Sequence, residues 1–391
     1  DPNGSPEMPF ATIQAALDAA QSGDRILLNP GVYTGPGNRD LDPNGLILTI
    51  QGSEPSDPDV IAQTIIDPNY LGRGFVFRNH EDPNFLLMGL TIRNTWSQQE
   101  DDPPHGSAVS CSGASPTIRY CIFQDCDADG GWGGAIYGEF CDMQIEHCLF
   151  FGNRARYGGA IGANLFSRMT FDHCTIAGNQ AWFNGGGVIC DFDTSITLTN
   201  SILYFNRLVS TGKKGWQVSL RDSSMSVSFS SIANEPNDFE IVGNSLIQLH
   251  EGVLAAEPEF ASSVPSAPQS YSDLHLRSQA GRWDSDAAEW VTDIVTSPCI
   301  DAGDPNSSAW SAEPWPHGKR VNMGFYGGTL RASKNGNVAD FNVSGTVDLE
   351  DFSELSEQWL QNVSLDFHDL NNDGRIDLLD FERFSREWMQ D

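Results

Sequence analysis

The chain has 391 residues, a formal net charge of −31 and a sequence pI of about 4.3. This charge argues against nucleic acids and anionic membranes as partners, although it can also serve simply to keep an exported protein soluble. The sequence holds no apolar stretch of about 18 residues, so we expect no membrane span, and a start at Asp1 is typical of a mature exported bacterial protein without its signal peptide.

The first predicted element is an amphipathic helix over 10–21. Its apolar residues fall on one stripe at helical spacing, and Gly23 follows as a stop signal. The members of the stripe are Phe10, Ile13, Ala16, Leu17 and Ala20. Strand-like segments begin directly afterwards, so we expect this helix to cover the open end of a β structure, where strand edges and core side chains would otherwise be exposed.

Between 45 and 94 the chain predicts short strands joined by longer turns. The apolar runs are separated by Asp-Pro-Asn steps at Asp42, Asp67 and Asp82. The Asp and Asn side chains of these steps could serve as calcium ligands. Turn chemistry accounts for them without a metal, because Pro presets φ while Asp and Asn bond their own backbone.

The central part of the chain nearly repeats itself four times. The copies begin at Ala108, Gly134, Gly159 and Gly186, with a period of 25 to 27 residues. Each copy holds three short apolar runs bounded by Gly, Asn and Asp, and no run is long enough for a helix. A unit of this size cannot bury its own apolar face and must stack on its neighbours. The repeat therefore predicts a mostly β solenoid with three short strands per coil.

Two columns of matching residues favour a coil over a flat sheet. The columns are Cys121, Cys148, Cys174 and Ser201, and, five residues later, Cys126, Asn153, Asn179 and Asn206. In a coil they would stack at the strand spacing of about 4.8 Å, where Asn amides can bond along the ladder. This passage resembles the right-handed parallel β-helix proteins, and its GGAI and FxxN pieces are similar to polymorphic outer-membrane-protein repeats. The passage from Asp24 resembles the first coil of pectate-lyase-like β-helices. The resemblance implies a fold and not an activity.

The eight cysteines form no metal-binding pattern. Their smallest separation is five residues, between Cys121 and Cys126. Stacked cysteines of one column would come within disulfide range, but we expect them to remain buried thiols.

After Asn206 the repeat loosens. Residues 257–330 are rich in Ser, Pro and Trp, and their pieces SPCIDAGDP and NMGFYGGT resemble the closing segment of secreted bacterial β-helix proteins. We expect this segment to form an irregular C-terminal cover for the last coil, within a β-helix domain spanning 1–330. Residues 331–337 have the composition of a linker, and 338–391 form a separate acidic domain.

The strongest chemical motif is a duplicated calcium loop in this last domain. Acids and amides alternate around a Gly at loop position 6, as the six to eight oxygen ligands of Ca²⁺ require. The expected ligands at positions 1, 3, 5, 7, 9 and 12 are Asp340, Asn342, Ser344, Thr346, Asp348 and Asp351, and then Asp369, Asn371, Asp373, Arg375, Asp377 and Asp380. Thr346 and Arg375 would contribute backbone carbonyls. The second loop has one carboxylate more, so we expect it to bind calcium more tightly.

Each loop runs into a helix with the same apolar spacing. A duplicated loop and helix of this size, with Asp at position 12, resembles a dockerin, a small α-helical domain with EF-hand-type loops. The resemblance implies Ca²⁺ as the cofactor and a cohesin-like protein as a partner. The positions after the position 9 acids hold Leu349, Glu350, Leu378 and Leu379 in place of the Ser-Thr pairs of cellulosomal dockerins.

Chemistry for cleaving polysaccharides is sparse. Neither polygalacturonase motifs nor the Arg motifs of pectate lyases are present, which favours a non-enzymatic role and leaves the question open. The remaining catalytic candidates crowd equivalent turns of successive repeats: Asp125, Asp127, Asp129, Arg154 and Arg156. Acids and guanidinium groups on one face could hold a uronic acid with calcium. The alternative is a set of solvated surface pairs.

A stripe of aromatic residues precedes the Gly-Gly of successive repeats. Its members are Trp132, Tyr157, Trp182 and Phe183. Exposed rings would stack on sugar faces or anchor a protein partner, and the alternative is that they fold back over the turns.

Together these features predict an exported, extracellular or cell-surface β-helix protein that binds calcium. We expect a structural or adhesive role in a surface or matrix assembly, with a cohesin-like protein or copies of the chain itself bound through the dockerin-like module. The alternatives are a polysaccharide lyase or glycoside hydrolase acting on acidic glycans, and a noncatalytic protein that binds extracellular polysaccharide.

Overall fold

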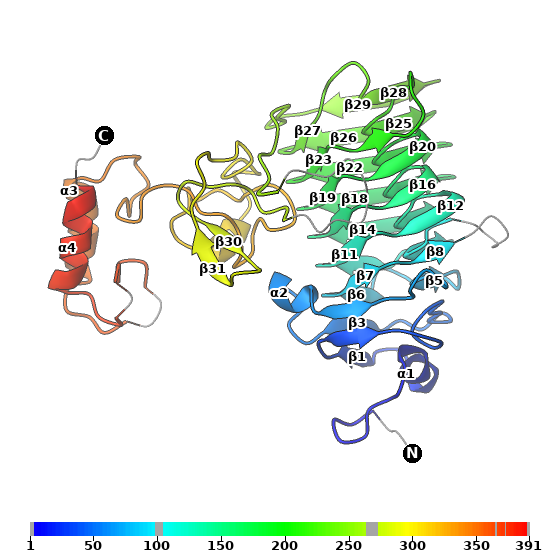
Figure 1. Ribbon diagram of the computed structural model, residues 1–391, viewed down its shortest axis with the longest axis horizontal. Coiled ribbons are helices and arrows are strands. Elements are labelled where there is room, and N and C mark those ends of the chain that lie inside the picture. Colours follow the sequence, from blue (N-terminus) through cyan, green and yellow to red (C-terminus); the bar gives the residue numbers. More distant parts are fainter. Residues whose placement is uncertain (1–3, 98–104, 263–272, 364–365, 372, 389–391) are drawn as a thin grey trace.

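Most of the chain is wound into a parallel β-helix, as the repeat predicted (Figure 1). Residues one coil apart pair directly in register, for example Ile118 with Ile145. The computed structural model describes residues 4–97, 105–262, 273–363, 366–371 and 373–388.

Three parallel sheets run the length of the β-helix. The nine-stranded sheet contains β1 (Arg25–Leu28), β3 (Thr49–Gly52), β6 (Leu86–Met88), β10 (Thr117–Arg119), β14 (Asp142–Glu146), β18 (Arg168–Asp172), β22 (Ser195–Thr199), β26 (Ser224–Ser228) and β29 (Leu246–Leu249). The eight-stranded sheet contains β2 (Gly31–Tyr33), β4 (Thr64–Ile66), β7 (Thr91–Arg93), β11 (Ile122–Gln124), β15 (Leu149–Phe151), β19 (Thr175–Ala177), β23 (Ile202–Tyr204) and β27 (Ser231–Ile232). The seven-stranded sheet contains β5 (Phe75–Phe77), β9 (Val109–Ser112), β13 (Ile136–Glu139), β17 (Ile161–Asn164), β21 (Val188–Asp191), β25 (Val218–Arg221) and β28 (Phe239–Val242).

The middle coils carry a fourth strand in addition to the three expected. The five-stranded sheet contains β8 (Trp96–Ser97), β12 (Asp127–Trp132), β16 (Arg154–Tyr157), β20 (Gln180–Asn184) and β24 (Arg207–Leu208). The sequence predicted turns here, because Gly and charged residues dominate. Once the coils stack in register, an extended turn finds backbone partners in the coil below and becomes a strand.

Inward columns of apolar side chains form one continuous core. Cys121, Cys148 and Cys174 are fully buried in it, and all eight cysteines are free thiols, as expected. Beside them the predicted asparagine ladder is present. The amide of Asn153 donates to the side-chain oxygen of Asn179 (2.9 Å), and the amide of Asn179 donates to that of Asn206 (2.9 Å).

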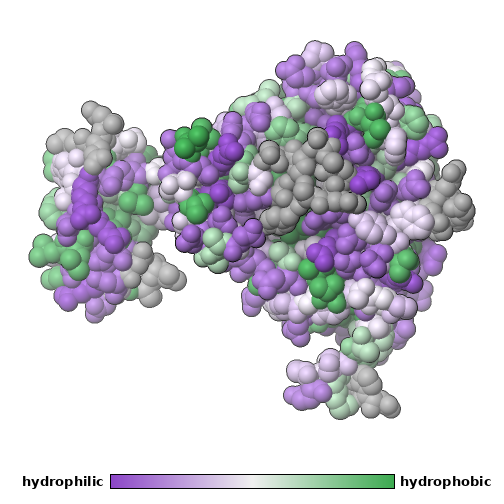
Figure 2. All heavy atoms as spheres, in the orientation of Figure 1, coloured by the Kyte–Doolittle hydropathy of each residue, from purple (hydrophilic) through white to green (hydrophobic). Residues whose placement is uncertain are grey.

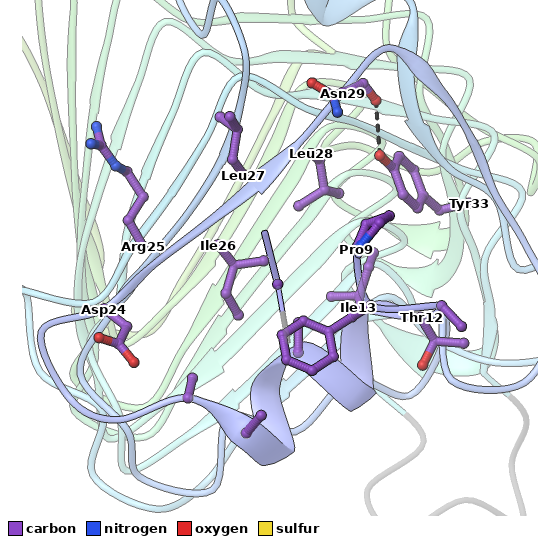
Figure 3. Close-up of a pocket in the computed structure, with 16 residues that line it drawn as sticks. Pro9, Thr12, Ile13, Asp24, Arg25, Ile26, Leu27, Leu28, Asn29 and Tyr33 are labelled. Atoms are coloured by element: carbon purple, nitrogen blue, oxygen red, sulfur yellow. Dashed lines mark hydrogen bonds between the residues drawn. The ribbon is translucent and has the colours of Figure 1, made fainter. Parts of the chain in front are cut away.

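The predicted N-terminal helix is present but shorter, as α1 (Ile13–Ala19), with Thr12 as its N-cap. Ile13 and Leu17 join the core of the first coil, so α1 covers that end of the β-helix. A cavity of about 640 Å³ remains between α1 and the first strands (Figure 3). At its edge the Tyr33 hydroxyl donates to the Asn29 carbonyl (2.9 Å).

The expected cover for the last coil is found elsewhere. The described part of 257–330 lies against the side of the β-helix (Figure 1), and 263–272 are outside the described residues. Phe325 is buried there, and its N–H donates to the Thr175 hydroxyl (3.0 Å). The reason is that the outer face of the eight-stranded sheet is itself apolar, so it needs a second layer. This face and the layer share a core of Leu149, Ala177, Ile202, Cys299, Met323 and Phe325.

Short elements complete this side layer. They are α2 (Pro58–Ile61), the antiparallel pair β30 (Arg282–Asp284) and β31 (Glu289–Val291), and a 3₁₀ turn over Ala309–Ala312. The segment expected as a linker belongs to the layer as well. Ala332 is fully buried, and Arg331 bonds Asp59 (2.7 Å) while its guanidinium carbon lies 4.1 Å from the Trp283 ring centroid. Composition alone did not reveal these contacts.

The C-terminal part holds α3 (Leu349–Glu357) and α4 (Leu378–Glu387), which pack around Phe341 and Phe384. Trp315 of the side layer reaches this small core, with its ring 6.4 Å from that of Phe341. No helix in the described ranges has the length and apolar character needed to cross a membrane. The face drawn in Figure 2 is largely hydrophilic, in line with the acidic composition.

Candidate functional site

The two predicted calcium loops are built alike. Asp340, at position 1 of the first loop, accepts hydrogen bonds from the backbone N–H groups of Ser344 (2.9 Å) and Gly345 (2.8 Å). Asp369 accepts from the same positions of the second loop, at 3.2 and 2.8 Å. The position 6 glycines have φ of 91° and 88°, where any other residue would be strained.

The acids at position 12 tie the ends of each loop together. Asp351 and Asp380 lie in the first turns of α3 and α4 and are nevertheless fully buried. Asp351 accepts from the N–H groups of Asn342 (3.0 Å) and Asp348 (2.9 Å). Asp380 accepts from the equivalent groups at 3.1 and 2.8 Å. Positions 3, 9 and 12 are thereby held together in both loops.

The donor set of these loops fits a hard cation. Each loop offers oxygen atoms from carboxylates, an amide and the backbone, which is the chemistry of Ca²⁺ sites. Within the described ranges no three or more His, Cys, Asp or Glu side chains converge as a metal site. The expected set of each loop also includes amide, hydroxyl or backbone carbonyl oxygens. In the first loop the Ser344 hydroxyl donates to the Thr346 carbonyl (3.0 Å), an expected ligand.

The structure brings three of the five catalytic candidates together. Asp125, Asp127 and Arg154 line a cavity of about 60 Å³ at the turn before the five-stranded sheet. Tyr70, from the loop after β4, together with Cys126 and Gly152, completes its wall. Glycine keeps this cavity open, because a Cβ on Gly152 would lie 2.6 Å from a carboxylate oxygen of Asp125.

Burial changes the acid chemistry of this cavity. It raises the pKa of Asp127 to about 6, with Arg154 opposing the change and Asp129 adding to it. Asp127 pairs in register with Arg154, and the same column continues through Gln180 to Arg207. Neighbouring coils therefore present an acid that titrates near neutrality beside guanidinium groups, an arrangement that could orient and protonate an anionic substrate.

The other two candidates lie away from the cavity. Asp129 is exposed on β12. Arg156 turns toward the aromatic stripe, with its guanidinium carbon 5.6 Å from the Tyr157 ring centroid and 5.4 Å from that of Phe183. Sequence reasoning missed Tyr70, which comes from a long turn and carries no sequence signal. It also missed the Gln180 and Arg207 column, which the 26- to 27-residue spacing from Arg154 would have revealed.

The aromatic stripe forms a ladder of rings along successive coils. The rings of Trp132, Tyr157 and Phe183 follow one another on successive coils, with centroids 5.5 and 5.7 Å apart. The backbone at Trp132 approaches Gly162 of β17 closely, because a Cβ on Gly162 would come within 3.1 Å of the Trp132 Cβ, and the Trp132 side chain is half-buried. Trp182 points outward and is 54% exposed.

A second aromatic ladder was not anticipated. Phe140, Phe166 and Phe192 occupy the turn that enters the nine-stranded sheet in three successive coils, and each is more than half exposed. All three have positive φ, which is unusual for bulky residues. The rings of Phe140 and Phe166 stack at 6.3 Å, so the ladder presents ring edges to solvent.

Two separate parts of the chain match known protein families. Residues 331–387 match the family of dockerin type I domains, and residues 184–303 match a family described as disaggregatase related. No curated protein matches the chain in sequence.

Similar solved structures include the pectin methylesterase from Aspergillus niger in its deglycosylated form (12% identity, TM-score 0.38) and in its penultimately deglycosylated form (13% identity, TM-score 0.30). Each comparison covers 70% of this chain and 92% of that enzyme. The duplicated loops with their buried position 12 acids, together with the family match, identify residues 331–387 as a dockerin type I domain carried by a parallel β-helix protein.

Proposed function

We propose that this chain is an exported protein whose dockerin domain attaches it, in a calcium-dependent manner, to a cohesin-type partner at the cell surface or in an extracellular matrix. The observation that carries the proposal is the equal construction of two loops around the buried acids Asp351 and Asp380. Dockerin type I domains bind calcium in general and typically bind cohesins.

Bound calcium would fill the two loops of the dockerin domain and also stabilise its fold. A carboxylate that is fully buried needs a positive partner or several hydrogen bonds, and a bound cation supplies the charge. The proposed ligands are Asp340, Asn342, Ser344, Thr346, Asp348 and Asp351 in the first loop, and Asp369, Asn371, Asp373, Arg375, Asp377 and Asp380 in the second. Loading would draw the Thr346 carbonyl away from the Ser344 hydroxyl in the first loop alone.

The partner surface is proposed at the starts of the two helices. Leu349 is 71% exposed, Leu378 is 70% exposed and Leu379 is 54% exposed, directly after the position 9 acids. Exposed apolar side chains at equivalent places in both loops favour a desolvated contact with another protein. Because calcium fixes the helix starts on which these leucines sit, chelation should remove the contact.

Binding measurements on the full chain test this proposal. We expect an immobilised type I cohesin module, or immobilised copies of this chain, to retain the protein in calcium and release it in EGTA. Leu378→Asp with Leu379→Asp should abolish retention. A matched control, Leu330→Asp, changes a leucine of the side layer that is 66% exposed and should have no effect. Retention that survives EGTA, or that both variants leave intact, would overturn the assignment, as would calcium-loaded protein that neither probe retains.

For the β-helix body we propose a structural or adhesive role. Its side chains are largely committed to stacking, with inward columns fully buried from coil to coil. The cavity of about 640 Å³ under α1 contains none of the predicted site residues. An elongated, repetitive surface held by a binding domain suits a component that spaces or displays others in an assembly.

One observation favours a second candidate function, action on acidic glycans. Asp127, with its pKa raised to about 6, lies beside Arg154 in an open cavity, as a general acid next to an anion-binding group would. Incubation with polygalacturonate, followed by assays for new reducing ends and unsaturated uronates, tests it. Asp127→Asn should abolish turnover, while Asp142→Asn, an exposed acid on another sheet, should not.

Absence of turnover with retention on a polygalacturonate column would instead support noncatalytic polysaccharide binding. In that case Trp182→Ala should weaken retention, because its ring is the most exposed of the stripe. Neither turnover nor retention would leave the structural role as the function of the body.

A further inference from the structure

The end of the β-helix that the chain reaches last is open. β28 is the outermost strand of the seven-stranded sheet, and β29 is the outermost strand of the nine-stranded sheet (Figure 1). No segment within the described ranges pairs with their outer edges, so both strands present unpaired backbone N–H and C=O groups.

Side chains that point inward in this last coil reach solvent. Leu249 pairs in register with Val227, and Ile241 pairs with Leu220. Val227 and Leu220 are 0% exposed, whereas Leu249 is 44% and Ile241 is 52% exposed. The same columns that form the dry core of the β-helix therefore end uncovered.

Among the described residues, neither irregular part of the chain covers this end. α1 lies over the first coil at the opposite end, and the side layer lies along the eight-stranded sheet (Figure 1). An occupant of the open coil must offer free strand edges on two sheets and apolar side chains between them. Among the described surfaces of this chain, the same end of a second copy offers all of these.

We propose that two copies of this chain associate end to end through the open coil, related by a two-fold axis. Such a contact is self-complementary, with β29 of each copy facing the other and the exposed inward side chains buried between them. The last coil has 16 residues (239–254). At about 30 to 40 Å² a residue on each side, two copies would bury roughly 1,000 Å². This is the lower limit of specific interfaces, so we expect a weak and reversible dimer.

The contact differs from association through the dockerin domain in two measurable ways. Each copy carries a net charge of −31, so the copies repel and added salt should strengthen the dimer by screening. The open coil contains no calcium loop, so the dimer should persist in EGTA. Failure of the dockerin proposal and failure of this one therefore give different results.

Sedimentation velocity of the full chain in EGTA, across a concentration series at low and high salt, tests the proposal. We expect a monomer–dimer equilibrium, with Leu249→Lys raising Kd at least about tenfold, because it places a charged side chain in the apolar centre of the contact. The control Thr197→Lys adds the same charge on the same sheet, two coils further in, and should leave Kd unchanged. A chain that is monomeric throughout overturns the proposal, as does a dimer that Leu249→Lys leaves intact.

A second variant tests the end-to-end dimer even if Leu249→Lys fails to fold. All eight native cysteines are buried, so Gln248→Cys introduces an accessible thiol on the edge of β29. A short bis-maleimide should convert this variant to a covalent dimer in EGTA, and Thr197→Cys should stay monomeric. Equal cross-linking of the two variants, or none with Gln248→Cys, would contradict the two-fold contact.

Discussion

The asparagine ladder provides the sharpest test of how the β-helix is held together. Asn179 is fully buried, and its side chain takes part in five hydrogen bonds. Its oxygen accepts from the backbone N–H of Asn153 (3.1 Å) and from the Asn153 amide (2.9 Å). Its amide donates to the carbonyls of Phe150 (3.0 Å) and Ala177 (3.2 Å) and to the Asn206 side chain (2.9 Å).

Replacing Asn179 with Ala removes all five bonds and puts nothing in their place. A hydrogen bond contributes about 1 kcal/mol net, and each buried group left without a partner costs about 1 to 3 kcal/mol. Asn153 loses both bonds to this side chain, while Asn206 keeps the backbone donor of residue 179. We therefore expect Asn179→Ala to lower the free energy of unfolding by about 3 to 5 kcal/mol, a large share of the total of about 5 to 15 kcal/mol for a domain.

Urea unfolding followed by circular dichroism, at fixed calcium, measures this change. The matched control is Asn84→Ala, an exposed asparagine, which should stay within about 0.5 kcal/mol of the parent. Asn179→Asp adds a second readout, because its carboxylate cannot donate and should be more destabilising at neutral pH than in acid, where it is protonated. An Asn179→Ala loss below about 1 kcal/mol, with an unchanged slope m, would refute the view that the ladder stabilises the coil stack.

Three further predictions concern the calcium loops and two buried titratable groups. Asp373→Ala should lower calcium affinity in calorimetric titration more than Ser344→Ala, because it removes a carboxylate rather than a hydroxyl, and the reverse order would contradict the charge argument. Burial lowers the pKa of His147 to about 3, with a further contribution from stacked His173, so the unfolded chain takes up protons first and stability should fall below about pH 6.5. Between neutral pH and pH 4 the free energy of unfolding of the parent should fall, and His147→Leu should make that fall smaller by about 3 kcal/mol. A variant whose free energy of unfolding depends on pH as the parent's does would contradict the assignment to His147. Burial raises the pKa of Glu313 to about 8, so the stability that its protonated form contributes is lost as pH rises from 4.5 toward 8. Glu313→Gln should therefore make the unfolding midpoint depend less on pH over that range. If the unfolding midpoint of Glu313→Gln still falls as steeply as that of the parent between pH 4.5 and 8, other groups cause the loss of stability.

Local pattern and period were enough to predict the architecture. A 25- to 27-residue repeat of short apolar runs can bury its surfaces only by stacking, so the coil, the cysteine column and the asparagine ladder followed from spacing alone. The calcium loops were equally readable, because ligand spacing, the position 6 glycine and the helix that follows all lie within a few residues of each other. The family match over 331–387 agrees with that prediction.

Features that join distant parts of the chain required the tertiary structure. Nothing near Tyr70 in the sequence indicates that it lines a cavity with Asp127, because a long turn brings it there. The fourth strand of the middle coils exists only because stacked turns supply each other with backbone partners. Spacing could place Trp132 at a turn but could not show that its ring lies 5.5 Å from the Tyr157 ring of the next coil.

The two ends of the β-helix show the same boundary between sequence and structure. The amphipathic stripe of 10–21 was sufficient to predict a cover for the first coil, because one helix makes all the contacts. For 257–330 the sequence indicated a cover but not its place, since the apolar outer face of the eight-stranded sheet forms only when distant strands come together. The described part of 257–330 packs on that outer face, and Leu249 and Ile241 of the last coil remain exposed.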